Sequence, residues 1–262
     1  MNRNAVSTVP TGGAPRPSAP HKTDGLGPSV WSSPLLRGLR EEDLKALLDI
    51  CRVAHAERDH QLLRAESDNV ALIARGAAKA HAATRTGDQV ITALLGPGDA
   101  WGFGVALGYL PSDTDVTAIQ PVDALIMPGQ ELRSLLLSRP AITAACLRTV
   151  GRQLALSQAE SLRFAGTTTR ERVTHRIFEL AQRWGRVDGD RVAITLPLTQ
   201  DELAAWAASS RESTAKVLHS LRRSGIVRTG RRSLIVLDIA RLEDRCRERP
   251  TESVLDLVGN PA

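Results

Sequence analysis

The segment 199–238 restricts the fold more than any other part of the chain, because its residues follow the pattern of two helices and a hairpin. The stretch "TQDELAAWAA" (199–208) predicts the first helix. Thr199 is its expected N-cap, and Glu202 follows three residues later as the partner in a capping box. Together these two residues indicate where this helix begins.

A second helix is expected over "SSRESTAKVLHSLRRSG" (209–225), after a turn of about three residues. Either Ser210 caps this helix, or Ser209 does so with Glu212 as its capping-box partner. The stretch "GIVRTGRRSLIVLD" (225–238) then predicts two short strands around Thr229-Gly230. The second helix is expected to bury one face, formed by the residues at i, i+3, i+4 and i+7, namely Thr214, Val217, Leu218 and Leu221. Helix, turn, helix and hairpin in this order indicate a winged helix-turn-helix.

The charged residues of the second helix lie off its buried face, and its first turn is expected to point out of the domain. A helix that reads bases in the major groove needs this geometry. Arg can pair with guanine and Glu can accept from cytosine, so we predict that Arg211, Glu212 and Lys216 read base edges. The residues expected near DNA phosphates are Arg222, Arg223, Arg228, Arg231 and Arg232. The predicted contact set also includes Thr199, Ser210 and Ser213. The alternative is a charged helix that faces only solvent.

Positive charge is concentrated at one end of the chain. Residues 170–249 hold seventeen Lys and Arg against eleven Asp and Glu, a net charge of +6, whereas the whole chain carries +5. A basic C-terminal third beside a near-neutral body favours a module that binds a polyanion. An arginine-rich surface that is merely solvated is the alternative.

Several classes of protein are disfavoured by what the sequence lacks. It contains no run of eighteen apolar residues, so we expect no membrane span, and its N-terminus has no apolar region typical of a secretory signal. Cys51, Cys146 and Cys246 are about a hundred residues apart and form no C-x-x-C pair. A cytoplasmic protein without a metal or other cofactor is therefore expected. The H-E-x-x-H, G-x-S-x-G, P-loop and G-x-G-x-x-G motifs are absent, so we do not expect an enzyme.

The rest of the chain divides by composition. Residues 1–30 are rich in Pro and Gly and are expected to be disordered. An amphipathic helix is expected within 34–52, and short strands separated by turns, such as Gly87-Asp88 and Gly96–Asp99, are expected within 60–128. These strands indicate a small antiparallel barrel or sandwich in a domain over 31–137.

A long helix is expected over 138–165, followed by a winged-helix domain over 166–240 and a tail over 241–262. The a/d spacing of a coiled coil is met by Leu147, Val150, Leu154, Ser157, Ser161 and Phe164. This spacing predicts a homodimer seam. A helix packed only on its own domain is the alternative. Within 166–240, "TTTRERVTHRIFELAQRWGR" (167–186) predicts a further helix, and 187–197 predicts a turn and one strand.

The stretch "LTQDELAAWAASSRESTAKVLHSLRRSGIV" resembles the helix-turn-helix of the Crp/Fnr family. Upstream, "HQLLRAESDNVALIARGAAKA" resembles the opening of that family's cyclic-nucleotide-binding β-roll, with its G-x-[VA]-[KR] motif, and "LGPGDAWGFGVALG" resembles the loop that carries the phosphate cassette. The resemblance covers about residues 34–240. It implies an α+β fold with an antiparallel β-roll, a dimerisation helix and a winged helix-turn-helix. It also implies homodimers on a palindromic DNA site and control of transcription through RNA polymerase.

The sequence departs from the family where relatives bind a cyclic nucleotide. The first half of the cassette corresponds to Gly102-Phe103-Gly104, with Phe103 in place of the Glu that bonds the ribose. The second half places Thr114 where relatives have the phosphate-binding Arg, and Asp115 follows it. We therefore expect no dependence on cyclic AMP, since the phosphate would lose its charge-assisted partner and meet a carboxylate. Either the β-roll stays unliganded, or it binds a less anionic ligand near Ser157 and Gln158.

Three further expectations follow. Relatives that bind an iron–sulfur cluster have several clustered cysteines, whereas Cys51 stands alone in this region, so such a cluster is not expected. His55, His60 and His81 are candidate haem ligands, but each is expected to be an ordinary surface or edge residue. Ala208 occupies the turn position that relatives often give to Gly, which costs roughly 1 kcal/mol if the backbone there is left-handed. A scaffold that uses the winged helix for protein contacts is the remaining rival to DNA binding, and the salt dependence of binding separates the two.

Overall fold

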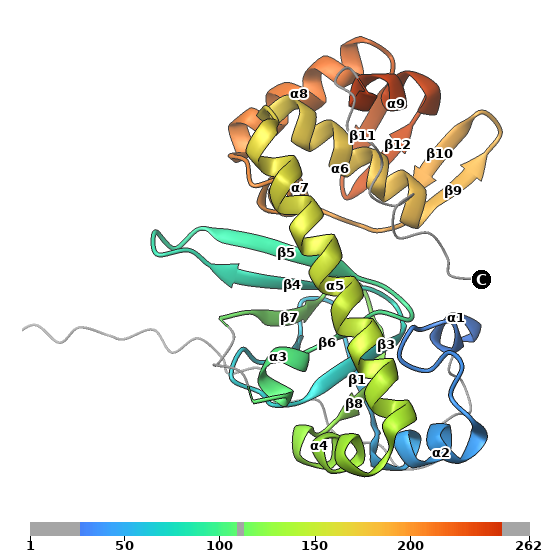
Figure 1. The fold of residues 1–262 in the computed structure, drawn as a ribbon. Helices are drawn as coiled ribbons and strands as arrows, with labels where there is room; N and C mark the ends of the chain where they lie inside the picture. Colours follow the sequence, from blue (N-terminus) through green and yellow to red (C-terminus); the bar gives the residue numbers. More distant parts are fainter. Residues whose placement is uncertain (1–26, 109–112, 248–262) are drawn as a thin grey trace, which may run out of the picture.

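The described part of the chain forms a domain with two sheets, then a long helix and a winged helix-turn-helix with a sheet of its own (Figure 1). The structure is a computed structural model that describes residues 27–108 and 113–247. Helix α5 (Pro140–Gly166) runs past the sheets and reaches the C-terminal helices, so that it connects the two halves of the molecule. The α+β class with an antiparallel β-roll that the sequence predicts is confirmed.

The β-roll consists, within the described residues, of two four-stranded antiparallel sheets. The order of the first is β1 (Arg52–Ala56), β8 (Val122–Met127), β3 (Val70–Arg75) and β6 (Ala100–Trp101). The order of the second is β2 (Gln61–Leu63), β7 (Asp115–Ala118), β4 (Ala78–Ala83) and β5 (Gln89–Leu95). Small residues such as Ala71, Ala78 and Ala80 are fully buried in the apolar cluster between the two sheets. Because these side chains are small, the two sheets can approach each other closely. The expected turns are present, with Gly87 and Gly98 at φ of 88° and 91°.

Helices cover the first sheet. They are α1 (Pro28–Trp31), α2 (Glu41–Ile50), α3 (Phe103–Ala106), α4 (Gly129–Ser138) and the first turns of α5. The apolar face predicted within 34–52 is present, since Leu47 is fully buried. The sequence pattern does not predict strand β1 or helix α4. The disorder expected over residues 1–30 falls mostly outside the described residues, but Pro28–Trp31 is helical and Val30 is buried, so the predicted boundary lies too far along the chain.

The C-terminal half forms a winged helix-turn-helix. Its elements are α6 (Thr169–Trp184), β9 (Gly185–Asp188), β10 (Arg191–Ile194), α7 (Gln200–Trp206), α8 (Arg211–Arg223), β11 (Val227–Gly230), β12 (Ser233–Val236) and α9 (Ile239–Arg247). The four strands pair in the order β11-β12-β10-β9, so the segment expected to hold one strand contributes a hairpin. Leu242 of α9 is fully buried, and the predicted tail therefore begins inside the domain, while residues 248–262 lie outside the description.

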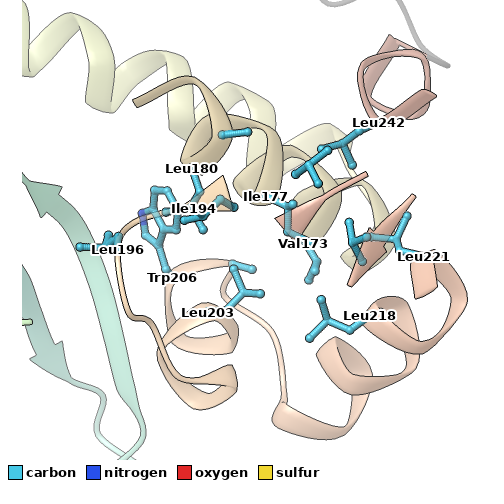
Figure 2. Packing of buried hydrophobic residues seen from close by; sticks show 14 of the residues in the cluster. Val173, Ile177, Leu180, Ile194, Leu196, Leu203, Trp206, Leu218, Leu221 and Leu242 are labelled. Atoms are coloured by element: carbon cyan, nitrogen blue, oxygen red, sulfur yellow. The ribbon is translucent and has the colours of Figure 1, made fainter. Parts of the chain in front are cut away.

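One apolar core joins the two halves of the molecule. Leu180, Leu203, Trp206 and Leu218 converge from α6, α7 and α8 (Figure 2). The same cluster continues into the β-roll through Ala77, Ile91, Leu94 and Ile119, each at most 3% exposed. The winged helix is thus packed on the β-roll. No helix in the described ranges is long and apolar enough to cross a membrane.

Candidate nucleic-acid interface

The first helix of the motif, α7, begins at the capping box predicted from the sequence. The Oγ1 atom of Thr199 accepts a hydrogen bond from the backbone N–H of Glu202 at 3.1 Å. In return, Glu202 Oε2 accepts from the Thr199 N–H at 2.8 Å. Two N–H groups at the helix start thereby find acceptors.

The second helix, α8, is capped by Ser210, which decides between the two predicted caps. Its Oγ accepts from the Ser213 N–H at 3.1 Å. Glu212 is not a capping partner, because its carboxylate binds Lys216 Nζ one turn later at 2.6 Å. That hydrogen bond holds the pKa of Glu212 below its usual value.

The two faces of α8 differ as the sequence predicts. Thr214, Val217, Leu218 and Leu221 are buried, and Figure 2 shows Leu218 and Leu221 directed into the core. The side chains of Arg211, Glu212 and Lys216 are 76%, 78% and 74% exposed. The first turn of α8 therefore presents a guanidinium, a carboxylate and an ammonium group to solvent.

A cleft of about 470 Å³ lies between α7, the start of α8 and the wing hairpin β11–β12. Thr199, Arg211, Arg231 and Arg232 all line it. Arg211 Nε lies 3.1 Å from Asp201 Oδ1 across the cleft, but both groups are mostly exposed. An exposed pair of this kind contributes only about 0–1 kcal/mol, so the guanidinium can exchange its partner.

The wing turns at a different place from the predicted one. Gly230 pairs with Ser233, so the loop consists of Arg231 and Arg232, with Arg232 at a φ of 53°, and Thr229-Gly230 belongs to β11. Both arginines are exposed at the tip of the wing. The shift places two positive charges at the exposed tip of the wing.

Arg222 and Arg223 lie at the opposite end of α8 from Arg211. Both are exposed, and Arg222 Nη1 donates to Thr229 Oγ1 of the wing at 3.4 Å. Neither lines the cleft. The structure thus brings Thr199, Arg211 and the wing arginines together, and separates the arginines of the helix end from them.

Helix α5 exposes an apolar face along its length. Leu147, Leu154 and Leu162 are 67%, 57% and 78% exposed, and Ser157 and Ser161 are exposed as well. Val150, expected on the same seam, packs partly against its own domain beside Ile142 and Cys146. Val150 is thus partly buried, whereas the next residue, Gly151, is exposed.

The β-roll retains a small cavity where relatives have the phosphate cassette. Its volume is about 190 Å³, and its lining includes Gly102, Phe103, Gly104 and Thr114. Phe103 is 3% exposed and packs in the core beneath the cavity. Gly102 has a φ of 108°, and a Cβ there would lie 2.2 Å from the Asn69 carbonyl oxygen, so this residue has to be Gly.

The cavity lining includes the polar residues Arg64, Ser67 and Gln153, which were not predicted, and lacks one residue that was. Asp115 is absent from the lining, because its carboxylate accepts from Ala65 N at 2.9 Å and Gln61 Nε2 at 2.8 Å. This corrects the expectation that a phosphate would meet that carboxylate. Arg64 and Gln153 line the cavity instead, from the segment after β2 and from α5. Neither residue belongs to the cassette motif, so the sequence gives no signal for them. Ser157 and Gln158 of α5, which were expected near a ligand, are exposed.

The three histidines take ordinary positions. His55 lies 2.9 Å from Asp123 Oδ1 and 3.0 Å from Glu57 Oε1, and hydrogen bonds to these carboxylates raise its pKa. His81 Nε2 lies 2.8 Å from Thr117 Oγ1, and burial lowers its pKa. His60 is exposed.

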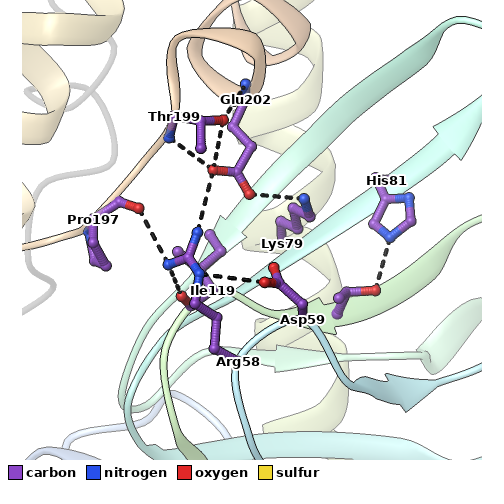
Figure 3. Close-up of polar contacts among 9 residues, drawn as sticks. Arg58, Asp59, Lys79, His81, Ile119, Pro197, Thr199 and Glu202 are labelled. Atoms are coloured by element: carbon purple, nitrogen blue, oxygen red, sulfur yellow. Dashed lines mark hydrogen bonds and ion pairs between the residues drawn. The ribbon is translucent and has the colours of Figure 1, made fainter. Parts of the chain in front are cut away.

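A buried ion pair joins the β-roll to the first helix of the motif (Figure 3). Lys79 Nζ of β4 lies 2.8 Å from Glu202 Oε1 of α7, and both residues are less than 10% exposed. Arg58 Nη2 lies 3.7 Å from Glu202 Oε2, and its guanidinium donates to the carbonyls of Ile119 and Pro197. Lys79 is the last residue of the G-x-[VA]-[KR] motif, which was the one sequence signal for this contact.

Both halves of the chain match known families. The Crp-like helix-turn-helix domain matches residues 171–245, and the cyclic nucleotide-binding domain matches residues 55–139. Together these matches cover more than half of the chain.

Similar proteins are transcription regulators. The CRP-like cAMP-activated global transcriptional regulator of Mycobacterium tuberculosis is 29% identical over 180 residues, which are 69% of this chain and 80% of the relative. The cyclic AMP receptor protein of Thermus thermophilus is 25% identical over 173 residues, 66% of this chain and 77% of the relative.

The fold matches solved structures as well. A CRP/FNR family transcriptional regulator of Thermus thermophilus superposes with a TM-score of 0.65 at 21% identity, over 76% of this chain and 100% of the other. FixK2 of Bradyrhizobium japonicum gives 0.64 at 20% identity, over 74% and 96%. With the predicted motifs present in the fold and both domain families matched, the chain belongs to the Crp/Fnr family of transcription regulators.

Proposed function

We propose that this regulator binds a pseudo-palindromic operator as a homodimer, without cyclic AMP, and acts on transcription through RNA polymerase. Arg211, Glu212 and Lys216 read base edges in each half-site. The DNA phosphates are contacted by Arg231 and Arg232 of the wing and by Arg222 and Arg223. The sugar–phosphate backbone of the DNA is also contacted by Thr199, Ser210 and Ser213.

The observation that supports DNA reading is the start of α8. Three charged side chains, each more than 70% exposed, stand on the first turns of a capped helix. Of these three side chains, Arg211 lines the cleft that Arg231 and Arg232 line from the wing. A major groove accepts a helix in this position, with the wing along the neighbouring phosphates.

Replacing Arg211 tests base reading. We expect Arg211→Ala to weaken binding to the best operator by about 1–3 kcal/mol and to relax the preference at one base pair. The operator is first selected from random duplexes, and affinities are then measured by fluorescence anisotropy. Arg231→Ala should instead weaken all sequences alike and lower the slope of log K against log salt by about 1.

Arg186→Ala is the matched control, because Arg186 is an exposed arginine of the same domain on β9, outside the cleft. It removes the same charge without touching the proposed interface. If Arg211→Ala and Arg186→Ala behaved alike on the selected operator, Arg211 would not read bases. Binding that showed no salt dependence would favour a protein partner over DNA.

The proposed independence of cyclic AMP is supported by the cavity in the β-roll. Its volume is about 190 Å³, Phe103 offers no acceptor for a ribose hydroxyl, and Thr114 offers no charge for a phosphate. A lost charge-assisted hydrogen bond costs about 1.5–3 kcal/mol, so affinity should fall by two or more orders of magnitude once both partners are missing.

Titration calorimetry with cyclic AMP and cyclic GMP checks this expectation, with the cAMP-activated relative from Mycobacterium tuberculosis as the positive control. We expect no heat at micromolar ligand. A micromolar Kd together with tighter operator binding would contradict the proposal. The second candidate is a regulator that binds a different small ligand, favoured by Arg64 and Gln153 on the cavity wall. In that case Arg64→Ala would change operator affinity only when the ligand is present.

A further inference from the structure

The turn between α7 and α8 contains a residue in an unfavourable backbone conformation. Ala208 has a φ of 45°, in the left-handed region that Gly adopts without cost and Ala does not. Ser210, two residues later, is the N-cap of α8. The conformation of Ala208 therefore sets the direction in which α8 leaves α7.

The guanidinium of Arg172 binds the backbone carbonyls of Ala208 and of the residue before it. Arg172 Nε donates to the Ala207 carbonyl oxygen at 3.0 Å, and Arg172 Nη2 donates to the Ala208 carbonyl oxygen at 3.1 Å. These oxygens lie at the C-terminal end of α7, where the helix dipole favours a cation. Four residues along α6, Arg176 Nε donates to the Trp206 carbonyl oxygen at 3.2 Å, so successive carbonyls of the turn are held from α6.

The same guanidinium is fixed at the junction of α5 and α6. Arg172 Nη1 donates to the Thr167 carbonyl oxygen at 2.9 Å, and Nη2 also reaches Thr169 Oγ1 at 3.3 Å. Its Cζ lies 5.6 Å from the centre of the Phe164 ring at the end of α5. Because the guanidinium is held from this side, little freedom remains for it to lose when it binds the turn.

We propose that Arg172 is a positioning residue for DNA reading, which holds the strained turn at Ala208 and so fixes the recognition helix α8 relative to the end of α5. It touches no DNA itself. Its contribution depends on the residue at 208, since a Gly there would adopt the same conformation without support. The inference rests on the proposed function for its DNA readout, but not for its structural readout.

The test is a double-mutant cycle of Arg172→Gln and Ala208→Gly, with Arg172→Lys and the control Arg186→Gln. Affinity is measured for the selected operator and for an unrelated duplex, well below the unfolding temperature. We expect Arg172→Gln to weaken operator binding about tenfold, with binding to the unrelated duplex unchanged within about twofold. Tenfold corresponds to about 1.4 kcal/mol, within the usual range of coupling between neighbouring residues.

In the Ala208→Gly background, the same replacement should cost about threefold or less. Arg172→Lys keeps the charge but lacks the planar fork that bridges two carbonyls, so it should restore little of the loss. An equal penalty in both backgrounds, or an equal loss on both duplexes, would overturn the inference. The first result would mean that Arg172 does not act through the turn, and the second that it acts only on overall stability.

Amide hydrogen exchange supplies a readout without DNA. The Ser209 N–H donates to the Ala204 carbonyl oxygen at 3.0 Å and reports whether the turn is closed. We expect faster exchange at Ser209 in Arg172→Gln and recovery in the double variant. If no operator can be selected, the proposed function fails while this measurement still decides the inference. Unchanged exchange in Arg172→Gln would refute it in either case.

Discussion

Lys79→Met is expected to lower the free energy of unfolding by about 3 kcal/mol at pH 7. Removing one partner of a buried ion pair leaves the other charge without compensation, which typically costs about 3–5 kcal/mol. The lower end applies here because Glu202 keeps the Thr199 N–H at 2.8 Å and Arg58 Nη2 at 3.7 Å. Urea denaturation measures the change.

Lys216→Met is a closely matched control. It also removes a Lys–Glu pair, at 2.6 Å, but both side chains there are more than 70% exposed. An exposed pair contributes about 0–1 kcal/mol, so the two variants should differ by about 2 kcal/mol or more. Equal effects of the two replacements would show that the buried pair does not stabilise the contact between β4 and α7.

The stability difference between the wild type and Lys79→Met should also depend on pH, in a direction that the pKa of Glu202 determines. Burial raises the pKa of Glu202, but hydrogen bonds from Lys79 and Thr199 lower it by more, so its pKa lies below the usual 4.5. The ionised pair therefore contributes stability above the unfolded-state pKa and loses it as the pH falls through the folded-state pKa. The difference between the wild type and Lys79→Met should be full at pH 7 and should shrink below about pH 4.5.

Leu154→Asp is expected to convert the proposed dimer into monomers. Leu154 is 57% exposed at the middle of the apolar face of α5, and two copies of this face would bring the two aspartates together. Burying two like charges costs several kcal/mol, so association should weaken on the order of a thousandfold. Sedimentation at micromolar protein measures the association state.

Operator binding should fall together with dimerisation, because a monomer engages only one half-site. Leu137→Asp is the control: Leu137 is 91% exposed on α4 and not on α5, and its replacement should leave the dimer intact. A Leu154→Asp dimer that persisted at micromolar concentration would place the seam elsewhere on the molecule.

Local features of the motif could be predicted because neighbouring residues determine them. The capping box of Thr199 and Glu202 and the buried face of α8 depend on residues within two turns of a helix, and both are present. The choice between Ser209 and Ser210 as N-cap stayed open, since both can accept from a nearby N–H. The positive φ of Ala208 agrees with its place at the turn position that relatives often give to Gly, which the resemblance and not the residue itself indicated.

Features that depend on pairing between distant residues could not be predicted. The wing loop falls on Arg231 and Arg232 because the register of β11 and β12 is set by packing, and Thr229-Gly230 is an equally good turn sequence. Val150 and Gly151 are one residue apart, and only the packing of α5 on its own domain decides which of them faces solvent. Lys79 and Glu202 are 123 residues apart, and Arg64 reaches the cavity from outside the cassette.

The apolar cluster that runs from Leu180 and Trp206 into Leu94 and Ile119 limits how such regulators can be recombined. A hybrid gene that joined this β-roll to another winged helix at the α5–α6 junction would leave Ile91, Leu94 and Ile119 against a foreign surface. Each side chain exposed in this way costs about 1.5–3 kcal/mol and adds to a patch prone to aggregation. A working hybrid must therefore carry the facing residues of α6 and α7 with it, and grafting the reading helix α8 alone is the less disruptive exchange.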